Sequence, residues 1–379
     1  MIPQADPGAG YRARQAEIDA AIATALASGW YILGKEVTAF EREFADWLGT
    51  QHAIGVANGT DAITLALRGL GIGPGDAVAT VSHTAVATVA AIEMAGATPV
   101  LVDIDPDHYT MSADALQRAI AAQPAGAPIR AVVVVHLYGQ PADLDAIVAI
   151  ARAHGLRIVE DCAQAHGAVW RGIRVGCFGD AAAFSLYPTK NLAALGDGGI
   201  VATGDAAVAE RIAALRQYGW RERYISAEAG VNSRLDELQA AVLRVRLRHL
   251  DGENARRQAI AACYDAALVR AGAAPPHRRA GAEHVFHQYV IASDARDALQ
   301  ARLRAAGIGT NVHYPLPVHR QPAYQGRVAI GPDGLARSER AAATVLSLPM
   351  FPQLADAQID AVCAALVDAA AHGLLRAPV

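Results

Sequence analysis

Lysine is scarce in this chain, and that scarcity limits the chemistry that its side-chain amines can perform. Of the 33 basic residues, only Lys35 and Lys190 are lysines, and the others are arginines. An arginine stays protonated and forms no Schiff base with an aldehyde, whereas a lysine can do so. Lys190 follows an apolar run and a proline-containing turn in AFSLYPTKNLAALGDGG, residues 183–199. Taken alone, Lys190 is more simply interpreted as a surface lysine. A catalytic role therefore depends on whether other residues of the chain could bind an aldehyde cofactor beside it.

A turn that suits a phosphate group occurs earlier in the chain. NGTDAITLAL, residues 58–67, places Gly59 and Thr60 where a strand gives way to a helix. Free backbone N–H groups and the helix dipole favour an anion at such a helix start. Ser185, five residues before Lys190, can add a hydroxyl donor. A helix cap by Thr60 or Asp61 explains the same turn, so the pattern alone leaves both interpretations open.

A carboxylate stands at the end of a core strand in LRIVED, residues 156–161. The side chains of a strand alternate between its two faces, so Asp161 and Glu160 point in opposite directions. A helix cap is the ordinary role of such a residue, but a buried carboxylate without a cation is costly, and a protonated pyridine nitrogen supplies that cation. Gln164 can contact the phenolic oxygen or the ring of the same ligand. Together these residues predict pyridoxal phosphate (PLP), bound covalently by Lys190.

The elements that would position these residues follow a strand–helix alternation. Short apolar runs precede alanine-rich helical patterns, a signature of a mostly parallel sheet with helices on both faces. Ligands of such sheets bind at the carboxyl ends of the strands. The expected strands are residues 53–57, 77–81, 98–104, 129–137, 156–161, 181–187 and 199–204.

The second part of the chain reads differently. A long helical stretch begins near residue 233 and is expected to connect a large domain to a smaller one. A strand, the helix ARDALQARLRAAG and two further helices follow, which is an α+β pattern. We expect an α/β fold with a large PLP-binding domain over residues 1–250 and a small C-terminal α+β domain over residues 251–379.

Composition excludes several classes of function. The formal charge is −4 and the isoelectric point is near 6.3, so no excess of positive charge favours nucleic acid or a membrane surface. No apolar run has the roughly 20 residues that a membrane span needs. The four cysteines are scattered without metal-site or disulfide spacing. We expect a cytoplasmic protein without a metal site.

Five segments carry a resemblance to a known family. GTDA, EDCAQAHGA, SLYPTKNLAALGDGG, GVNSRLDELQAAVLRVRLRHLD and HYPLPVH resemble, in order and spacing, the DegT/DnrJ/StrS family of sugar aminotransferases. The resemblance covers nearly the whole chain. It implies the PLP fold type I architecture, similar to that of aspartate aminotransferase.

The resemblance also implies roles for matched residues. Lys190 would hold PLP, Asp161 would pair with the pyridinium, and Gln164 would contact the ring oxygen. The phosphate would be bound by Gly59, Thr60, Ser185 and, from the neighbouring subunit, Asn232. An obligate homodimer with shared active sites follows from that last role, although Asn232 can also be read as an ordinary loop residue before a helix.

One segment departs from the family pattern. Many relatives place an aromatic residue over the PLP ring in the segment that matches SHTAVAT, where this chain has Ala85. We expect His83 either to take over this stacking or to be a buried histidine whose polar atoms are satisfied by the protein.

The resemblance implies L-glutamate as amino donor and a nucleotide-diphosphate keto-sugar as acceptor. The branch that it matches best aminates C3 of TDP-3-keto-6-deoxyhexoses, while C4 amination and a UDP-linked 3-keto-sugar stay open. Candidate contacts to the acceptor lie in three segments and are Tyr187, Arg221, Arg223, Tyr224, His313, Tyr314 and His319.

Three other functions compete with this one. PLP-dependent sugar dehydratases of the same fold replace the lysine by histidine, which Lys190 argues against. A non-catalytic nucleotide-sugar-binding or regulatory protein would not need Lys190, Asp161 and Ser185 together. A nicotinamide oxidoreductase would carry GxGxxG after the first strand, and AIGVANGTDA lacks it.

Overall fold

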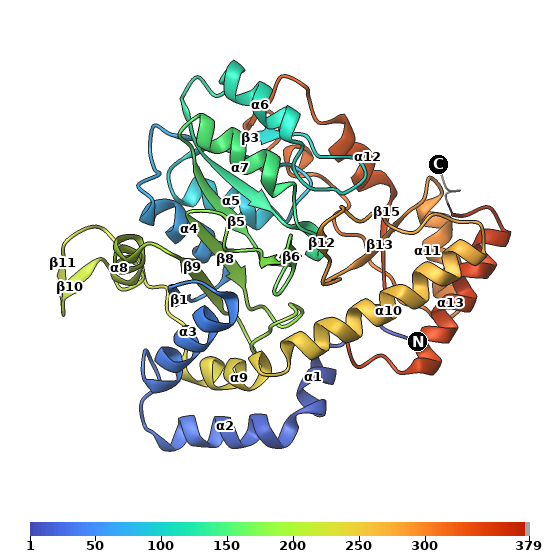
Figure 1. The fold of residues 1–379 in the computed structure, drawn as a ribbon, viewed down its shortest axis with the longest axis horizontal. Coiled ribbons are helices and arrows are strands. Elements are labelled where there is room, and N and C mark those ends of the chain that lie inside the picture. Colours follow the sequence, from blue (N-terminus) through green and yellow to red (C-terminus); the bar gives the residue numbers. More distant parts are fainter. Residues whose placement is uncertain (376–379) are drawn as a thin grey trace.

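An eight-stranded sheet forms the centre of the protein in a computed structural model that describes residues 1–375 (Figure 1). The strands lie in the order β1-β9-β8-β5-β4-β2-β3-β14. All pairs from β8 to β14 are parallel, whereas β9 is antiparallel to both of its neighbours. The expected mostly parallel sheet is therefore confirmed. The strand bounds are β1 His52–Val56, β2 Ala77–Val81, β3 Thr98–Val102, β4 Ile129–Val135, β5 Arg157–Asp161, β8 Ala181–Ser185, β9 Gly199–Thr203 and β14 Ala329–Ile330.

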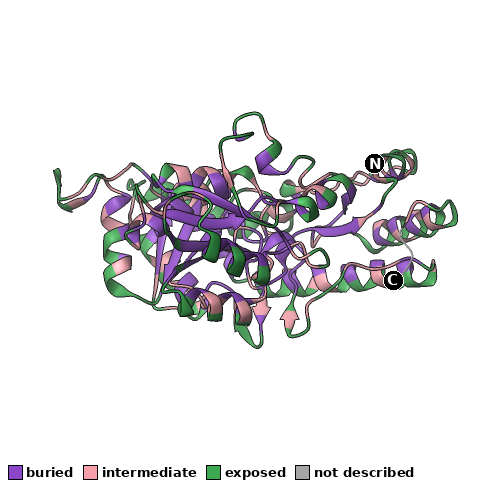
Figure 2. Ribbon diagram, turned by 90° about the horizontal axis from the view of Figure 1, so that it is seen from above, coloured by how far each residue is buried: buried purple, intermediate pink, exposed green. Residues whose placement is uncertain are grey.

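Helices cover both faces of this sheet, and Figure 2 shows the buried sheet between helices whose outer sides are exposed. Side chains alternate along β5, so that Ile158 and Val159 belong to different hydrophobic clusters. The Val159 side packs against α4 (Gly59–Gly69), α5 (Val86–Met94) and α8 (Ala206–Leu215). The Ile158 side packs against α3 (Lys35–Leu48), α6 (Ala113–Ala122), α7 (Leu144–Ala153) and α9 (Glu237–Leu247).

The long helical stretch expected after residue 233 is two helices. The break lies between α9 and the 21-residue α10 (Leu250–Arg270), where Arg248 caps the end of α9 and His249 caps the start of α10. In Figure 1, α10 runs from beneath the sheet to the C-terminal part of the chain. There a third cluster joins α10 to β13 (Tyr289–Ala292), α11 (Arg296–Ala305), β15 (Val345–Leu348) and α13 (Asp356–Ala371).

Two C-terminal elements return to the large sheet. β14 pairs with β3, and the N-terminus of α12 (Ala336–Thr344) is held by the Asp103 carboxylate, which accepts the N–H groups of Arg337 and Ser338. The division into a large domain and a small C-terminal domain at residue 250 stays a prediction.

The remaining elements are short or peripheral. A hairpin of β10 and β11 projects from the body beyond α8 (Figure 1), and we call residues 218–226 the arm. No helix within residues 1–375 combines the length and the apolar character that crossing a membrane requires. The remaining bounds are α1 Pro7–Ala13, α2 Gln15–Ala27, η1 Leu137–Gly139, β6 Val169–Trp170, β7 Ile173–Arg174, β10 Trp220–Glu222, β11 Ile225–Ser226, β12 Ala282–Glu283 and η2 Val318–Arg320.

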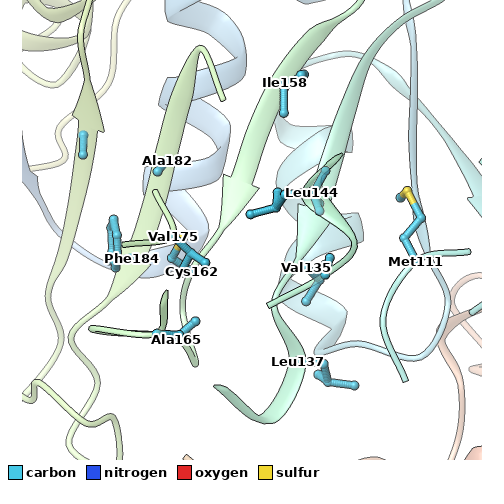
Figure 3. Packing of buried hydrophobic residues seen from close by; sticks show 14 of the residues in the cluster. Met111, Val135, Leu137, Leu144, Ile158, Cys162, Ala165, Val175, Ala182 and Phe184 are labelled. Atoms are coloured by element: carbon cyan, nitrogen blue, oxygen red, sulfur yellow. The ribbon is translucent and has the colours of Figure 1, made fainter. Parts of the chain in front are cut away.

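Phe184 on β8 connects the sheet to the helices on its Ile158 side. Its ring meets Phe44 edge-on, with 5.1 Å between ring centroids, and it is fully buried. Figure 3 shows it beside Val175 and Cys162 in the same cluster. Because Phe184 directly precedes Ser185, this packing fixes the end of β8 where the loop to Lys190 begins.

Replacing Phe184 by alanine should therefore destabilise the fold. We expect Phe184→Ala to lower the free energy of unfolding by about 3–5 kcal/mol, the usual cost of emptying a buried aromatic site. Urea unfolding at fixed protein concentration measures it, with Ile173→Ala, whose parent side chain is 51% exposed, as control. A loss below about 1 kcal/mol would show that Phe184 does not anchor the strand.

Candidate active site

Lys190 lies in the loop between β8 and β9, and its amine is removed from bulk water. Burial lowers the pKa of this amine to about 8, although the Asp161 carboxylate opposes part of that shift. The backbone N–H of Lys190 donates to the carbonyl of Tyr187, which closes the turn around Pro188. The amine is therefore largely protonated at pH 7 but loses its proton far more readily than an exposed lysine.

Asp161 ends β5 and is buried without an ion pair to a basic side chain within 4 Å among residues 1–375. The Thr88 hydroxyl donates to one carboxylate oxygen at 2.9 Å, and the Ala163 N–H donates to the other at 3.1 Å. Burial raises the pKa of Asp161, and these hydrogen bonds and the Lys190 charge offset part of that rise. A buried carboxylate in this position fits a cationic ring nitrogen, which would supply the missing counter-charge.

Glu160, the preceding residue, points to the opposite face as strand alternation predicts. Its carboxylate accepts the backbone N–H groups of Gly176, Phe178 and Gly179 at 2.7–2.8 Å and lies 3.1 Å from His136 Nε2. Burial alone would raise the pKa of Glu160, but His136 and the backbone donors lower it below its usual value. Glu160 is thus satisfied by the protein itself, whereas Asp161 is not.

Glu160 also belongs to a group of potential metal ligands. His136, Glu160 and Cys162 offer ligand atoms within 4.8 Å of one another. His136 Nδ1 accepts the N–H of Ala142, so its other nitrogen carries the proton and donates to Glu160. The contacts of this group are therefore those of a hydrogen-bonded pair, and the absence of a metal site stays a prediction.

The turn expected to bind phosphate forms where α4 begins. The cap of α4 is Asn58, whose side-chain oxygen accepts the Asp61 N–H at 2.8 Å, so the alternative cap by Thr60 or Asp61 is wrong. A Cβ on Gly59 would come within 2.5 Å of Ser185 Cβ. Only glycine therefore lets the start of α4 approach the Ser185 side chain so closely.

No side-chain hydrogen bond joins Asn232 to this cradle within residues 1–375. Its side chain is exposed, and its neighbour Ser233 donates to the Asp61 carboxylate at 2.7 Å. Exposure leaves Asn232 accessible to a second subunit, and its contact with phosphate stays a prediction.

Gln164 connects the Asp161 region to the C-terminal part of the chain. Its amide oxygen accepts the Tyr138 N–H at 2.6 Å, and its amide nitrogen donates to the Tyr314 hydroxyl at 3.1 Å. Burial and then the Asp161 charge raise the pKa of Tyr314 to about 12, so this phenol stays neutral. Gln164 is therefore held rigidly beside Asp161, as a contact to a ligand oxygen requires.

His83 is fully buried in an aromatic group with Tyr109 and Tyr138, each 6.1 Å away between ring centroids. Its Nε2 lies 2.8 Å from the Tyr138 hydroxyl, which in turn donates to the carbonyl of His313. His83 Nε2 is thus the donor to Tyr138, and Nδ1 has no partner among the described residues. Whether this imidazole covers a cofactor ring stays a prediction.

Sequence reasoning missed several residues that the fold brings to this site. Thr88 holds Asp161, Tyr138 joins Gln164 to His83, and the Lys190 charge acts on His166 and His287. His166 lies within EDCAQAHGA, so the motif itself carried a signal for it. Tyr138, with its positive φ of 61°, and His287 give no local signal.

The residues expected to contact the acceptor are dispersed in the chain. Tyr187 is exposed beside Lys190, whereas Arg221, Arg223 and Tyr224 lie on the arm. His313 Nδ1 is 2.9 Å from the Ser347 hydroxyl, and Tyr314 contacts Gln164. His319 is buried, with its ring nitrogens 2.7 Å from Ser82 Oγ and 2.9 Å from Glu339 Oε1. Of this set, the structure brings His313 and Tyr314 to the Asp161 region.

The low pKa of Lys190 can be tested on cofactor-free protein. We expect reductive methylation of Lys190 to reach half its maximal rate near pH 8, because only the neutral amine reacts and burial stabilises that form. Free lysine, with a pKa of about 10.4, is the comparison amine. Asp161→Asn removes the charge that opposes the shift, so it should move the profile to lower pH. Peptide mass spectrometry measures the rates, and a wild-type profile that coincides with free lysine would contradict the burial.

Comparisons with known proteins agree with this geometry. The model of the DegT/DnrJ/EryC1/StrS aminotransferase family matches residues 12–367. The chain is 50% identical to the dTDP-3-amino-3,4,6-trideoxy-alpha-D-glucose transaminase of Streptomyces venezuelae, over 95% of each chain. It is 42% identical to a UDP-N-acetyl-3-dehydro-alpha-D-glucosamine 3-aminotransferase of Acidithiobacillus ferrooxidans, over 98% of each chain.

A solved structure shows the same architecture. S. venezuelae DesV in complex with a ketimine intermediate superimposes with a TM-score of 0.93 at 48% identity, covering 97% of this chain and 98% of that one. The expected PLP fold type I architecture and dependence on PLP are thereby confirmed. The protein is a PLP-dependent enzyme that belongs to the DegT/DnrJ/EryC1/StrS aminotransferase family.

Proposed function

We propose that this aminotransferase transfers the amino group of L-glutamate to a nucleotide-linked keto-sugar, at C3 of a TDP-3-keto-6-deoxyhexose. The observation that carries the proposal is a desolvated Lys190 near Asp161, a buried carboxylate that forms no ion pair within 4 Å in the described chain. The 50% identity to a dTDP-3-amino sugar transaminase supports the acceptor and the ring carbon.

Different residues of the site would bind different parts of the cofactor. Asp161 would face the ring nitrogen, Gln164 the ring oxygen, and the start of α4 with Ser185 the phosphate. Bound PLP supplies the electron sink that stabilises negative charge on the carbon of the donor. Lys190, with a pKa near 8, would accept the proton of the donor carbon at near-neutral pH. In the second half of the reaction, Lys190 would give a proton to the sugar carbon, and the keto oxygen of the sugar would leave as water.

The acceptor has alternatives in the same family. Relatives at 36–50% identity include enzymes named for dTDP-linked, UDP-linked and GDP-linked sugars, so C4 amination or a UDP-linked 3-keto-sugar competes with the main proposal. Incubation with glutamate and a panel of TDP- and UDP-keto-sugars, with products identified by mass spectrometry and NMR, decides between them. Amination of a UDP-linked sugar alone would overturn the proposed acceptor.

We also propose a homodimer with shared active sites. The arm projects from its own subunit and carries Tyr224, which is 71% exposed, and Arg221. Trp30 and Tyr31, between α2 and α3, are also exposed. Large exposed aromatic side chains of this kind are typical of a surface that contacts another protein.

All four cysteines are free thiols, which supports the cytoplasm as the compartment.

Removal of the Lys190 amine should abolish turnover. We expect Lys190→Ala to lose the absorbance of covalently bound cofactor and to slow the glutamate half-reaction by about 100- to 10,000-fold, because the proton has no other carrier. The spectrum and its bleaching by glutamate measure both effects. Lys35→Ala is the matched control, since Lys35 is the other lysine of the chain and is exposed. A half-reaction retained in Lys190→Ala would refute the assignment.

Sharing of sites can be tested with mixed dimers. Subunits carrying Lys190→Ala and subunits carrying Asn232→Ala should each be impaired, and their mixture should regain about a quarter to a half of the wild-type activity per mixed dimer if each site uses Asn232 of the other subunit. Two purification tags isolate the mixed species for the assay. Mixed dimers as inactive as their parents would place Asn232 in the site of its own chain.

A further inference from the structure

A small polar cavity adjoins Lys190 on the side of the C-terminal part of the chain. We call it the Lys190 cavity, and it is lined by Lys190, Arg246, Glu253 and Arg257 together with residues 5–7, 10, 188, 189, 191 and 350–353. Figure 1 shows α1 near the junction of α9 and α10. Arg246 lies on α9, and Glu253 and Arg257 lie on α10. The cavity volume of about 50 Å³ is several times the roughly 10–15 Å³ that one water needs, so it has room for a carboxylate group but not for a nucleotide sugar.

Arg257 on α10 is buried and lacks a salt bridge within residues 1–375. Its Nη1 donates to the carbonyls of Phe286 and Met350 at 3.1 and 3.0 Å. Its Nε and Nη2 make no hydrogen bond to the described protein. Burial lowers the pKa of Arg257 to about 10, with Glu253 opposing, so the guanidinium is charged and has two unused donors beside the cavity.

Arg246 on α9 adds a second cation that is only partly satisfied. Its Nη1 donates to the carbonyl of Ala193 at 3.0 Å, in the loop that carries Lys190. Its Nε and Nη2 are buried without a partner, and a Cβ on Gly10 would lie 3.6 Å from Nη2, so α1 covers this side of the guanidinium. Burial lowers the pKa of Arg246, and Glu253 again opposes.

The protein supplies too little negative charge for this cavity. Glu253 accepts from Gln353 at 3.2 Å and makes no ion pair within 4 Å with either arginine. Asp6, at the edge, is paired with Arg12 at 2.5 Å. Within the described residues, Glu253 is thus the one charge that opposes Arg246 and Arg257, whereas the charge that acts on the Lys190 amine is that of Asp161. Buried cations without a partner are costly, so a site of this composition gains free energy when an anion enters.

We propose that the Lys190 cavity binds a carboxylate of the amino donor, with Arg257 as its hydrogen-bonding partner and Arg246 as a second positive charge. This inference rests on the proposed function, because the donor must bring its amine to the position that the Lys190 amine leaves. A carboxylate held on the C-terminal side of Lys190 directs that amine toward Asp161 and the cofactor ring. The unused Nε and Nη2 of Arg257 have the spacing that accepts a carboxylate through two parallel hydrogen bonds.

The test uses unreactive anions on the full-length, cofactor-loaded protein. Glutarate is a five-carbon dicarboxylate without an amine, and pentanoate is the matching monocarboxylate. Isothermal titration should show the Kd of glutarate raised about tenfold or more in Arg246→Gln, because one of two cations is lost. Arg257→Lys should weaken it by a similar factor, because lysine keeps the charge but not the paired donors.

The matched control is Arg248→Gln, since Arg248 is at the end of the same helix but is exposed and pairs with Glu17. Thermal unfolding shows which variants fold. If Arg257→Lys does not fold, the Kd of Arg246→Gln alone tests the proposal. Weaker binding of glutarate alone assigns the cavity to the side-chain carboxylate of the donor, and weaker binding of both anions assigns it to the carboxylate next to the amine. Unchanged binding of both anions in Arg246→Gln overturns the proposal.

A kinetic readout separates this proposal from the function on which it rests. Arg246→Gln should raise the KM for glutamate about tenfold and leave the KM for the keto-sugar unchanged. If wild type is bleached by glutamate while the variant shows the same KM, the cavity proposal fails and the proposed function stands. If no amino acid bleaches wild-type protein, the proposed function itself fails.

Discussion

A buried carboxylate at the end of β5 is the constraint on which the site depends. Asp161 is desolvated, and two hydrogen bonds hold it in place without neutralising it. An arrangement of this kind is costly in the ligand-free protein, because burial favours the protonated acid. It becomes favourable when a cation binds against it. A protonated pyridine nitrogen is such a cation, and the carboxylate beside it keeps that nitrogen protonated. The cost of burying Asp161 is therefore offset by the cofactor that it binds.

The neighbouring carboxylate shows why only one of the two can serve this purpose. Glu160 and Asp161 are adjacent and both buried, and the alternation of the strand points them to opposite faces. The turn at residues 176–179 closes over Glu160 and supplies three N–H donors, and His136 supplies a fourth. Asp161 instead faces the edge where β4 and β5 end, with Val135, Asp161 and Ala183 in register. The sheet therefore separates a structural carboxylate from one that is available to a ligand.

Features of this site that depend on residues close together in the chain can be predicted from the sequence. Features that depend on contacts between distant elements cannot. The strand ends, the choice of Asp161 over Glu160 and the glycine turn before α4 follow from local patterns, because period-two alternation and a glycine turn are readable from neighbours. The roles of Tyr138 and Thr88 were not readable, because each depends on a contact with a residue on another element. The return of β14 to the large sheet was missed for the same reason, since a two-residue strand carries no periodicity.

The histidines around Lys190 limit where a proton can reside. Burial, and then the charge of Lys190, lowers the pKa of His166 to about 3 and that of His313 to about 4, and His287 is lowered well below its usual value. The Arg257 charge contributes to the lowering for both His166 and His287, so Arg257 and Lys190 act on the same imidazoles. These rings are neutral at pH 7 and can orient or hydrogen-bond a ligand. Because these imidazoles do not take up a second proton at that pH, and because arginine does not release one, the Lys190 amine remains the group of this site that can carry a proton to and from a substrate carbon.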